Sequence, residues 1–336
     1  MASMKDIAKY CAVSVATVSK ALNGQPDVGE ETRARICAAA ERLGYYPNSA
    51  ARALKTNRTY NIGVLFDDDT HVGLTHEYFS HVLNALKNEA EARGYDVTFI
   101  SNRLDTYRMS YLEHCRYRNV DGVAIANVDF TDPAVLELVG SDIPLVTIDY
   151  TFDGHSAVIS DNVQAMDQLT EYVIGCGHRK IAFICGEPTA VTRSRKAAFH
   201  RACRRHGLEI PDAYLISGIY HDPKTSGLAT RELLALKEPP TCILYPDDIS
   251  LLGGMTEIER HGLRIPDDIS IVGFDGIPLS RVLRPSLTTL CQDSETLGTR
   301  AAQLLIEAIE EPKLFVPRVV TVPGWVQPGQ TVKKLS

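Results

Sequence analysis

The chain has 336 residues, of which 44% are hydrophobic and 23% are charged, and its formal net charge is −7 at pH 7. This length is too great for one small core and suggests two or three domains, and the composition is that of a soluble globular protein. A net negative charge argues at first sight against a nucleic-acid partner, because binding to phosphates needs Lys and Arg.

The charge is unevenly distributed along the chain. Residues 1–60 carry nine Lys and Arg against five Asp and Glu, a net of +4, so the rest of the chain, from Asn61 to the end, carries −11. A basic end attached to an acidic body is typical of proteins that bind nucleic acid through that end. The asymmetry suggests such a partner without specifying it.

The eight cysteines are scattered, with no C-x-x-C and no other short spacing. This pattern favours reduced thiols used as small core residues over a disulfide framework or a zinc site. The N-terminal residues lack the apolar stretch of a signal peptide, and no apolar run reaches the length of about 18 residues that a membrane helix needs. The sequence therefore predicts a cytoplasmic protein that does not contact a membrane.

In chain order, the segment from Met1 to Gly44 predicts three short helices. Ser14 can N-cap the second helix, at residues 15–22, whose Val18 and Leu22 lie one turn apart and pack inward. The outward residues are small, polar or basic, as suits a helix that enters a major groove about 12 Å wide: Val15, Ala16, Thr17, Ser19 and Lys20. A generic helical hairpin has the same periodicity, so spacing alone leaves both interpretations open.

From Asn61 onward, short apolar runs alternate with amphipathic segments. Fully apolar strands that are each followed by a crossover helix indicate parallel sheets covered on both faces. Strands are expected at 61–66, 96–100, 122–126, 144–148, 157–160, 180–185, 214–218, 242–245, 269–274 and 318–322. Helices are expected near 78–93, 110–118, from 162, and near 195–206, 225–236, 249–261 and 294–309.

There are too many of these units for one sheet, and they fall into two groups that divide near residues 160–162. We expect two doubly wound subdomains that face each other, with a cleft at the carboxyl ends of their strands. The predicted boundaries are 1–46 for an all-α helix-turn-helix headpiece, 47–60 for a hinge helix or linker, 61–161 with 292–323 for one α/β subdomain, and 162–291 with 324–336 for the other.

Three motifs at the N-terminal end of the chain carry a specific resemblance. They read D-I-A-x-x-x-x-V-S-x-x-T-V-S-x-x-L-N from Asp6, V-x-x-x-T-R-x-R-I from Val28, and Y-x-P-N-x-x-A-R-x-L from Tyr45. The chain resembles the LacI/GalR family, named for the lactose and galactose repressors, and the resemblance runs its whole length. It implies a homodimeric regulator that binds palindromic operator DNA and whose periplasmic-binding-protein-like body binds a small effector.

The resemblance also implies how the second helix contacts DNA. Val15 and Ala16 would contact thymine methyl groups, because neither can form bidentate hydrogen bonds, and Lys20 would contact guanine. Thr17 and Ser19 would contact phosphates. Ser14 and Asn23, which flank these residues in the sequence, are also expected to contact DNA. Ala12 departs from the Gly or Asn that the family usually places in the turn; an Ala at positive φ costs roughly 1 kcal/mol.

The segment at residues 47–55 begins at Pro47, is rich in Ala and is too short to form a stable helix alone. A plain linker is one interpretation. The resemblance implies instead a hinge helix that folds on the operator and pairs with its mate in the minor groove, with Leu54 as the wedge between base steps. The residues expected to line the same groove are Asn48, Ala51 and Lys55.

In the body, the resemblance places effector contacts near the strand ends that face the cleft. Carboxylates and Arg hydrogen-bond to hydroxyl groups, and an aromatic face stacks on the apolar side of a ring, so a sugar or sugar derivative is expected. Asp161 and Asn162 look more like a helix N-cap than ligand contacts, Asp248 also fits a cap, and Tyr220 also fits ordinary packing. The candidates are Asp67, Asp68, Tyr78, Phe79, Asp149, Arg193, Arg195, Tyr220, Asp248 and Asp275.

Other functions have less support. His71, His76 and His81 recur every five residues, which spreads them around a helix, so no metal site is expected. No catalytic signature is visible, and neither enzymatic activity nor a cofactor is predicted. A solute-binding protein is the main alternative, but the segment at residues 1–60 and the missing signal peptide contradict it.

Overall fold

The computed structural model describes residues 2–22, 24–46, 53, 58–67, 73–104 and 107–335. These residues form two compact units, Met1–Thr59 and Tyr60–Ser336. None of the helices in the described part of the chain is long and apolar enough to span a bilayer.

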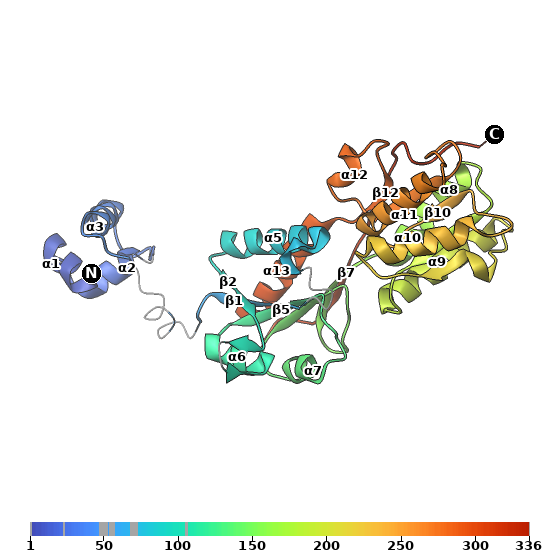
Figure 1. Ribbon diagram of the computed structural model, residues 1–336. Coiled ribbons are helices and arrows are strands. Elements are labelled where there is room, and N and C mark those ends of the chain that lie inside the picture. The colour runs from blue at the N-terminus through green and yellow to red at the C-terminus, as the bar shows by residue number, and fades with distance from the viewer. Residues whose placement is uncertain are drawn as a thin grey trace. The chain divides into compact units, whose positions relative to one another are not determined.

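The first unit is a bundle of three helices around a small core. The capping box of Ser3 and Asp6 fixes the start of the first helix. Nine buried side chains fill the space between the helices, among them Ile7, Val18 and Ile36, each of which is fully buried. The helices are α1 (Met4–Cys11), α2 (Val15–Leu22) and α3 (Glu30–Arg42), and all three are labelled in Figure 1.

The turn between α1 and α2 has the geometry that the sequence predicts. Ala12 ends α1 in the left-handed region, at φ 51°. Ser14 Oγ accepts a hydrogen bond from the backbone N–H of Thr17 at 3.0 Å, so it caps α2 as expected. Val18 is buried, whereas Leu22 is half-buried and Ala21 supplies the second buried contact.

The second unit contains two six-stranded sheets. The first has the strand order β13-β7-β6-β5-β1-β2, and all of its strands are parallel. Its strands are β1 (Asn61–Phe66), β2 (Asp96–Ile100), β5 (Gly122–Ala126), β6 (Leu145–Ile148), β7 (Ser156–Ser160) and β13 (Val319–Val322).

Helices cover both faces of the first sheet (Figure 1). Two pack against each other and against one face, and a Cβ on Gly298 would lie 2.0 Å from the Val82 carbonyl oxygen, so this close crossing requires glycine. The other two pack on the opposite face. The first pair is α5 (Glu77–Ala92) and α13 (Ser294–Glu310), and the second is α6 (Tyr111–Arg118) and α7 (Pro133–Val139).

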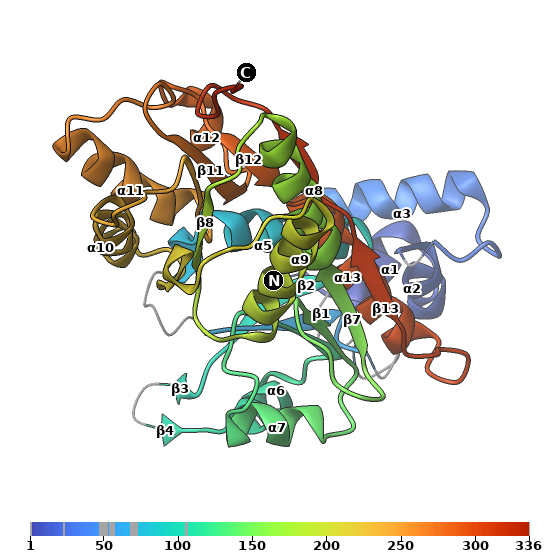
Figure 2. The same ribbon diagram turned by 90° about the vertical axis from the view of Figure 1, so that its right-hand side faces the viewer.

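The second sheet has the order β14-β12-β11-β10-β8-β9, and only its edge strand β14 is antiparallel to its neighbour. Its strands are β8 (Ile181–Cys185), β9 (Leu215–Ser217), β10 (Cys242–Leu244), β11 (Ser270–Asp275), β12 (Thr288–Cys291) and β14 (Trp325–Gln327). In Figure 2, α10 (Pro223–Leu234) and α11 (Asp248–Arg260) lie on one side of it, and α8 (Asn162–Gly175) and α9 (Ala190–Arg205) lie on the other.

A few short elements complete this unit. A small antiparallel ribbon joins two of them. They are β3 (Arg103–Leu104), β4 (Tyr107–Arg108), α12 (Leu279–Val282) and two 3₁₀ turns, Gly73–Thr75 and Asp212–Tyr214.

The predicted fold class is confirmed, including the return of the last predicted strand to the first sheet. The chain passes from the first sheet to the second between β7 and α8, returns between β12 and α13, and passes over again between β13 and β14. One helix start was wrong, since α9 begins at Ala190 instead of near Arg195, because Thr189 caps it. The sequence patterns missed α7, β12 and β14, which are short.

Candidate functional site

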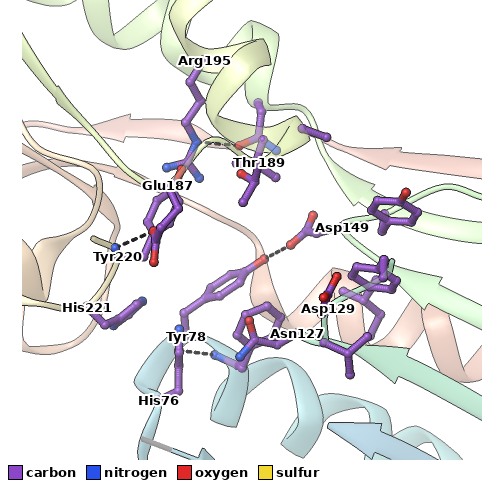
Figure 3. A pocket seen from close by; sticks show the side chains of 18 of the residues that line it. His76, Tyr78, Asn127, Asp129, Asp149, Glu187, Thr189, Arg195, Tyr220 and His221 are labelled. Atoms are coloured by element: carbon purple, nitrogen blue, oxygen red, sulfur yellow. Dashed lines mark hydrogen bonds between the residues drawn. The ribbon is translucent and has the colours of Figure 1, made fainter. Parts of the chain in front are cut away.

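A pocket with a volume of about 570 Å³ lies between the two sheets of the second unit. Its walls contain residues that directly follow strands of the first sheet, such as Asp67 after β1 and Asp149 after β6, and residues from the second, such as Asp275 at the end of β11. Figure 3 shows the side chains converging from both sides. Because carboxyl ends of parallel strands meet at one edge of a sheet, two facing sheets place both sets in one cleft.

On the wall of the first sheet, Tyr78 and Asp149 form a hydrogen-bonded pair (Figure 3). The Tyr78 hydroxyl donates to Asp149 Oδ2 at 2.9 Å, and the Ser160 N–H donates to Asp149 Oδ1 at 2.8 Å. Burial, together with the nearby Asp149 carboxylate, raises the pKa of Tyr78 well above 10.0, so the phenol keeps its proton. The pair therefore presents a fixed carboxylate to the pocket.

On the opposite wall, Arg195 is only 4% exposed and is held at three points. Its Nε donates to Asn162 Oδ1 at 2.8 Å, its Nη1 donates to the Pro246 carbonyl at 2.9 Å, and its guanidinium lies 3.5 Å from the centre of the Phe274 ring. These contacts fix the orientation of the guanidinium plane. Within the described residues, Nη2 donates no hydrogen bond, so this amino group can donate to a ligand.

Asp275 ends β11 with a strained backbone, at φ 100°, and lies next to Arg195 in the pocket wall. Its Oδ1 accepts a hydrogen bond from Gln292 Nε2 at 2.7 Å, and its Oδ2 lies 3.8 Å from His221 Nε2. Burial and the neighbouring Asp247 carboxylate raise the pKa of Asp275 well above 3.8, although Arg195 opposes this. The Asp275 carboxyl group can therefore exchange a proton with a ligand or form a hydrogen bond to it.

Tyr220 forms an aromatic surface beside these groups. Its hydroxyl lies 2.8 Å from the Thr192 hydroxyl, and its backbone N–H donates to Glu187 Oε2 at 2.9 Å. A Cβ on Gly186 would lie 2.1 Å from the Tyr220 ring, so only glycine there lets the ring take this position. Tyr220 is thus a held wall of the pocket.

The structure brings most of the predicted effector residues into one lining. Asp67 and Arg193 are exposed, and Arg193 donates to the Pro188 carbonyl. Asp68 lies outside the described residues. The predicted residues that line the pocket are Asp67, Tyr78, Phe79, Asp149, Arg193, Arg195, Tyr220 and Asp275.

Asp248 does not lie in the pocket lining, so the prediction that it contacts the effector was wrong. It is 1% exposed, its Oδ2 accepts from the N–H groups of Gly276 and Ile277, and its Oδ1 accepts from the Thr289 hydroxyl. These hydrogen bonds hold the loop after β11 in place. The N-cap of α11 is its neighbour Asp247, so the alternative interpretation of Asp248 as the cap was also off by one residue.

Several lining residues were not singled out from the sequence. Asn127 directly follows β5, as Asp149 follows β6, so the same strand-end rule would have found it. Its Nδ2 is buried without a hydrogen-bond partner among the described residues, which a ligand oxygen would supply. Asp161 does cap α8, as predicted, yet Asn162 also lines the pocket. The others include His76, Phe130, Tyr150, Glu187, His221 and Gln292.

The headpiece presents the side chains predicted to contact DNA along α2. Val15 is 42% exposed, Ala16 and Lys20 are exposed, and Thr17 and Ser19 are half-buried. Lys20 forms an ion pair with Asp27. Among the predicted DNA contacts, Asn23, Asn48, Ala51, Leu54 and Lys55 lie outside the described residues.

The described part of the chain contains no group of three or more His, Cys, Asp or Glu side chains arranged to hold a metal ion. All eight cysteines are free, and six of them are buried. Burial raises the pKa of the Cys185 thiol to about 11 and that of Cys203 to about 12, as expected for thiols that serve as packing groups.

Two family models match the chain. Residues 3–48 match the model described as bacterial regulatory proteins, lacI family, and residues 170–332 match a periplasmic binding protein-like domain. Among known proteins, the chain is 32% identical over 336 residues to the ribose operon repressor of Escherichia coli (strain K12), covering 98% of this chain and 99% of the relative. It is 31% identical over 314 residues to the transcriptional repressor PurR of Haemophilus influenzae, covering 92% and 91%.

Solved structures give the same result. The lac repressor dimer bound to operator and the anti-inducer ONPF matches with a TM-score of 0.80 and 25% identity, over 99% of each chain. The complex of the transcriptional regulator CelR with cellobiose matches with a TM-score of 0.72 at 22% identity, covering 98% of this chain and 100% of that one, which shows the fold alone.

Fold, headpiece and relatives together define a DNA-binding transcriptional repressor with a ligand-binding body, and not an enzyme. The chain belongs to the lacI family of bacterial regulatory proteins.

Proposed function

We propose that the chain is a homodimeric repressor whose pocket binds a neutral sugar, and that this binding changes its affinity for a palindromic operator. The main support for the proposal is that residues of both subdomains line the pocket. Asn127 and Asp149 come from the first sheet, and Arg195, Tyr220 and Asp275 come from the second. A ligand that contacts both walls has a different affinity for open and closed arrangements, and this difference is what allosteric control requires.

The chemistry of the walls favours an uncharged polyhydroxy ligand. Arg193 and Arg195 are the Arg side chains of the lining, against five carboxyl groups, so a strongly anionic ligand would be repelled. Rigid donors and acceptors can pair with vicinal hydroxyl groups, and aromatic faces can cover the apolar side of a ring. The carboxyl groups are those of Asp67, Asp129, Asp149, Glu187 and Asp275.

The matched relatives support the same ligand class. One is named a ribose operon repressor, and one structural neighbour is a complex with cellobiose. A second relative is named PurR, so purines are the competing ligand class to test.

Exposed apolar side chains support self-association. Ile219, Leu228 and Val282 are 39%, 52% and 67% exposed, and they lie before α10, on α10 and on α12. Such residues in contact with a second copy would remove apolar surface from water. Sedimentation of the full chain should give a dimer, and Leu228→Glu should shift it toward the monomer; a monomer at all concentrations would contradict this part of the proposal.

The ligand class is tested by thermal shift of the full chain with D-ribose, cellobiose, adenine and guanine. A ligand at about 100 times its Kd adds ~2.7 kcal/mol of stability, which gives a clear rise in Tm. We expect a sugar to raise the Tm of the wild type but not the Tm of Asp275→Asn. The control Asp132→Asn, a change at the N-cap of α7 outside the pocket, should show the same rise as the wild type. A shift with purines and none with sugars would overturn the assignment of a sugar.

A further inference from the structure

Two histidine rings from opposite walls touch at the pocket. His76 immediately precedes α5 of the first sheet, and His221 lies between β9 and α10 of the second. Their ring centres are 3.6 Å apart, with 49° between the ring planes, and Figure 3 shows the two side chains next to each other. They therefore form a direct contact between the two subdomains.

Each ring is held by its own subdomain. His76 is the N-cap of α5, where its Nδ1 accepts from the Phe79 N–H at 3.4 Å and its ring packs edge-on against the Phe79 ring, with the centres 4.9 Å apart. His221 adopts a strained backbone at φ 55°, and its N–H donates to Asp247 Oδ2 at 2.9 Å. The side chain of His221 is 9% exposed and His76 is 6% exposed. The contact is buried and anchored on both sides.

His221 also touches a carboxyl group that we assign to the effector site. Its Nε2 lies 3.8 Å from Asp275 Oδ2, while the other oxygen of Asp275 accepts from Gln292. Burial and Asp247 raise the pKa of Asp275, so a positive charge on His221 would favour the ionised form of the carboxyl group. The imidazole is thus close enough to Asp275 for its charge to influence the charge of the carboxyl group.

We propose that His221 positions Asp275 for the effector and that the contact between His76 and His221 holds the cleft closed only while at most one of the two rings is protonated. This proposal deepens, and rests on, the proposed function of the pocket. It assigns a role in effector affinity to two residues outside the predicted set of ligand contacts.

The surrounding charges explain the limit of one proton. Asp275 lies 3.8 Å from the His221 ring, and protons on both His221 and His76 would place two positive rings in contact in a buried site. Acidification through the range where histidines take up protons, about pH 5 to 8, should then separate the walls and weaken effector binding. Glu77 and Asp222 adjoin the two histidines in the chain, and the other charged or titratable side chains that line the pocket with the pair are Asp67, Tyr78, Asp129, Asp149, Glu187, Arg193, Arg195 and Tyr220.

The first test needs no effector. Imidazole signals of the ¹⁵N-histidine-labelled full chain are followed by NMR as the pH is lowered, for the wild type, His76→Gln and His221→Gln. We expect His221→Gln to move the titration midpoint of His76 to higher pH, because the repelling neighbour is gone. His81→Gln, an exposed histidine on α5, is the matched control and should leave both midpoints unchanged. Independent titration of His76 and His221 would overturn the contact.

The second test separates positioning from simple packing. The Kd for D-ribose, or for cellobiose if D-ribose gives no thermal shift, is measured in the full chain at about pH 7.5 and about pH 5.5. We expect the loss of affinity on acidification to be at least about threefold smaller in His76→Gln than in the wild type, and His221→Gln to bind more weakly at both pH values.

Parallel pH profiles in the wild type and His76→Gln would overturn the proposal. Failure of both sugars to bind would contradict the proposed effector class instead, and the titration would still decide whether the two histidines are coupled.

Discussion

At the scale of single residues, the site depends on side chains whose partners fix one orientation. Arg195 is the clearest case, because its guanidinium is held by Asn162, the Pro246 carbonyl and the face of Phe274. A lysine ammonium has neither the planar fork nor the flat face that these contacts use. The positive charge alone therefore does not define the role of this residue.

Arg195→Lys should weaken sugar binding by at least about tenfold, because the hydrogen bonds to Asn162 and the Pro246 carbonyl and the stacking on Phe274 are lost while the charge is kept. The measurement is titration calorimetry of the full chain with the sugar that gives the thermal shift. Arg193→Lys is the matched control, since Arg193 is exposed and its recorded hydrogen bond is to the Pro188 carbonyl. An Arg195→Lys variant that binds the sugar as tightly as the wild type would show that only the charge of this residue matters.

Asp248→Asn should change how stability depends on pH. Burial raises the pKa of Asp248 from 3.8 to about 7, so the folded protein loses stability through this group as the pH rises from about 4 to about 7. An asparagine oxygen can still accept from Gly276 and Ile277, and its amide can donate to the Thr289 hydroxyl. The variant should therefore gain stability relative to the wild type as the pH rises.

Urea unfolding midpoints at about pH 5 and about pH 8 test this, with Asp132→Asn, the cap of α7, as the control. If the difference between Asp248→Asn and the wild type is the same at both pH values, Asp248 does not titrate in this range.

Residues directly after strands were predictable, whereas their partners were not. Asp67, Asp149 and Asp275 follow or end apolar runs, so the strand-end rule finds them from the sequence. Asp248 also follows such a run, but its carboxyl group accepts hydrogen bonds from the loop after β11 and from Thr289 of β12. Such contacts between distant strands have no local sequence signal, and neither does the contact of His76 with His221.

At the scale of elements, α2 combines the side chains predicted to contact DNA with a buried apolar face. Its periodicity and its cap at Ser14 were predictable because both are local. The ion pair between Lys20 and Asp27 depends on the turn that follows α2 and was not predicted. This pair occupies the side chain expected to contact guanine.

Asp27→Asn should strengthen operator binding several-fold, because Lys20 no longer has to break its ion pair with Asp27 before it contacts DNA. The change also removes a negative charge near the phosphates. Glu31→Gln, in the exposed first turn of α3, removes the same charge without touching Lys20. Fluorescence anisotropy with labelled operator distinguishes the two effects. Equal gains in both variants would assign the effect to net charge and not to the ion pair.

The segment at residues 47–55 is predicted from the sequence to be a hinge helix with Leu54 as the wedge between base steps. Leu54→Ala should weaken operator binding by more than about tenfold while leaving sugar binding unchanged, because a wedge between base steps would be lost. Leu74→Ala, an exposed leucine of the body, is the control. Unchanged operator affinity in Leu54→Ala would contradict the hypothesis that Leu54 inserts between base steps.

At the scale of the whole molecule, the chain joins a basic headpiece to an acidic body. The net charge of −7 conceals a net of +4 over residues 1–60, which fits a protein that binds DNA through one end only. The body divides its chain between two sheets, and residues of both subdomains line one pocket. This division could be predicted from the alternation of strands and helices, although α7, β12 and β14 were too short to give a periodic signal.

The most direct test of the central claim is the Kd of the full chain for its operator, measured with and without a saturating concentration of the sugar that raises Tm. We predict a change of about 5-fold to 150-fold, in the range typical of allosteric coupling, and an equal reciprocal change in sugar affinity when operator is present. The change should be absent in Asp275→Asn. An operator Kd that stays the same while the sugar demonstrably binds would contradict the claim that this pocket controls DNA binding.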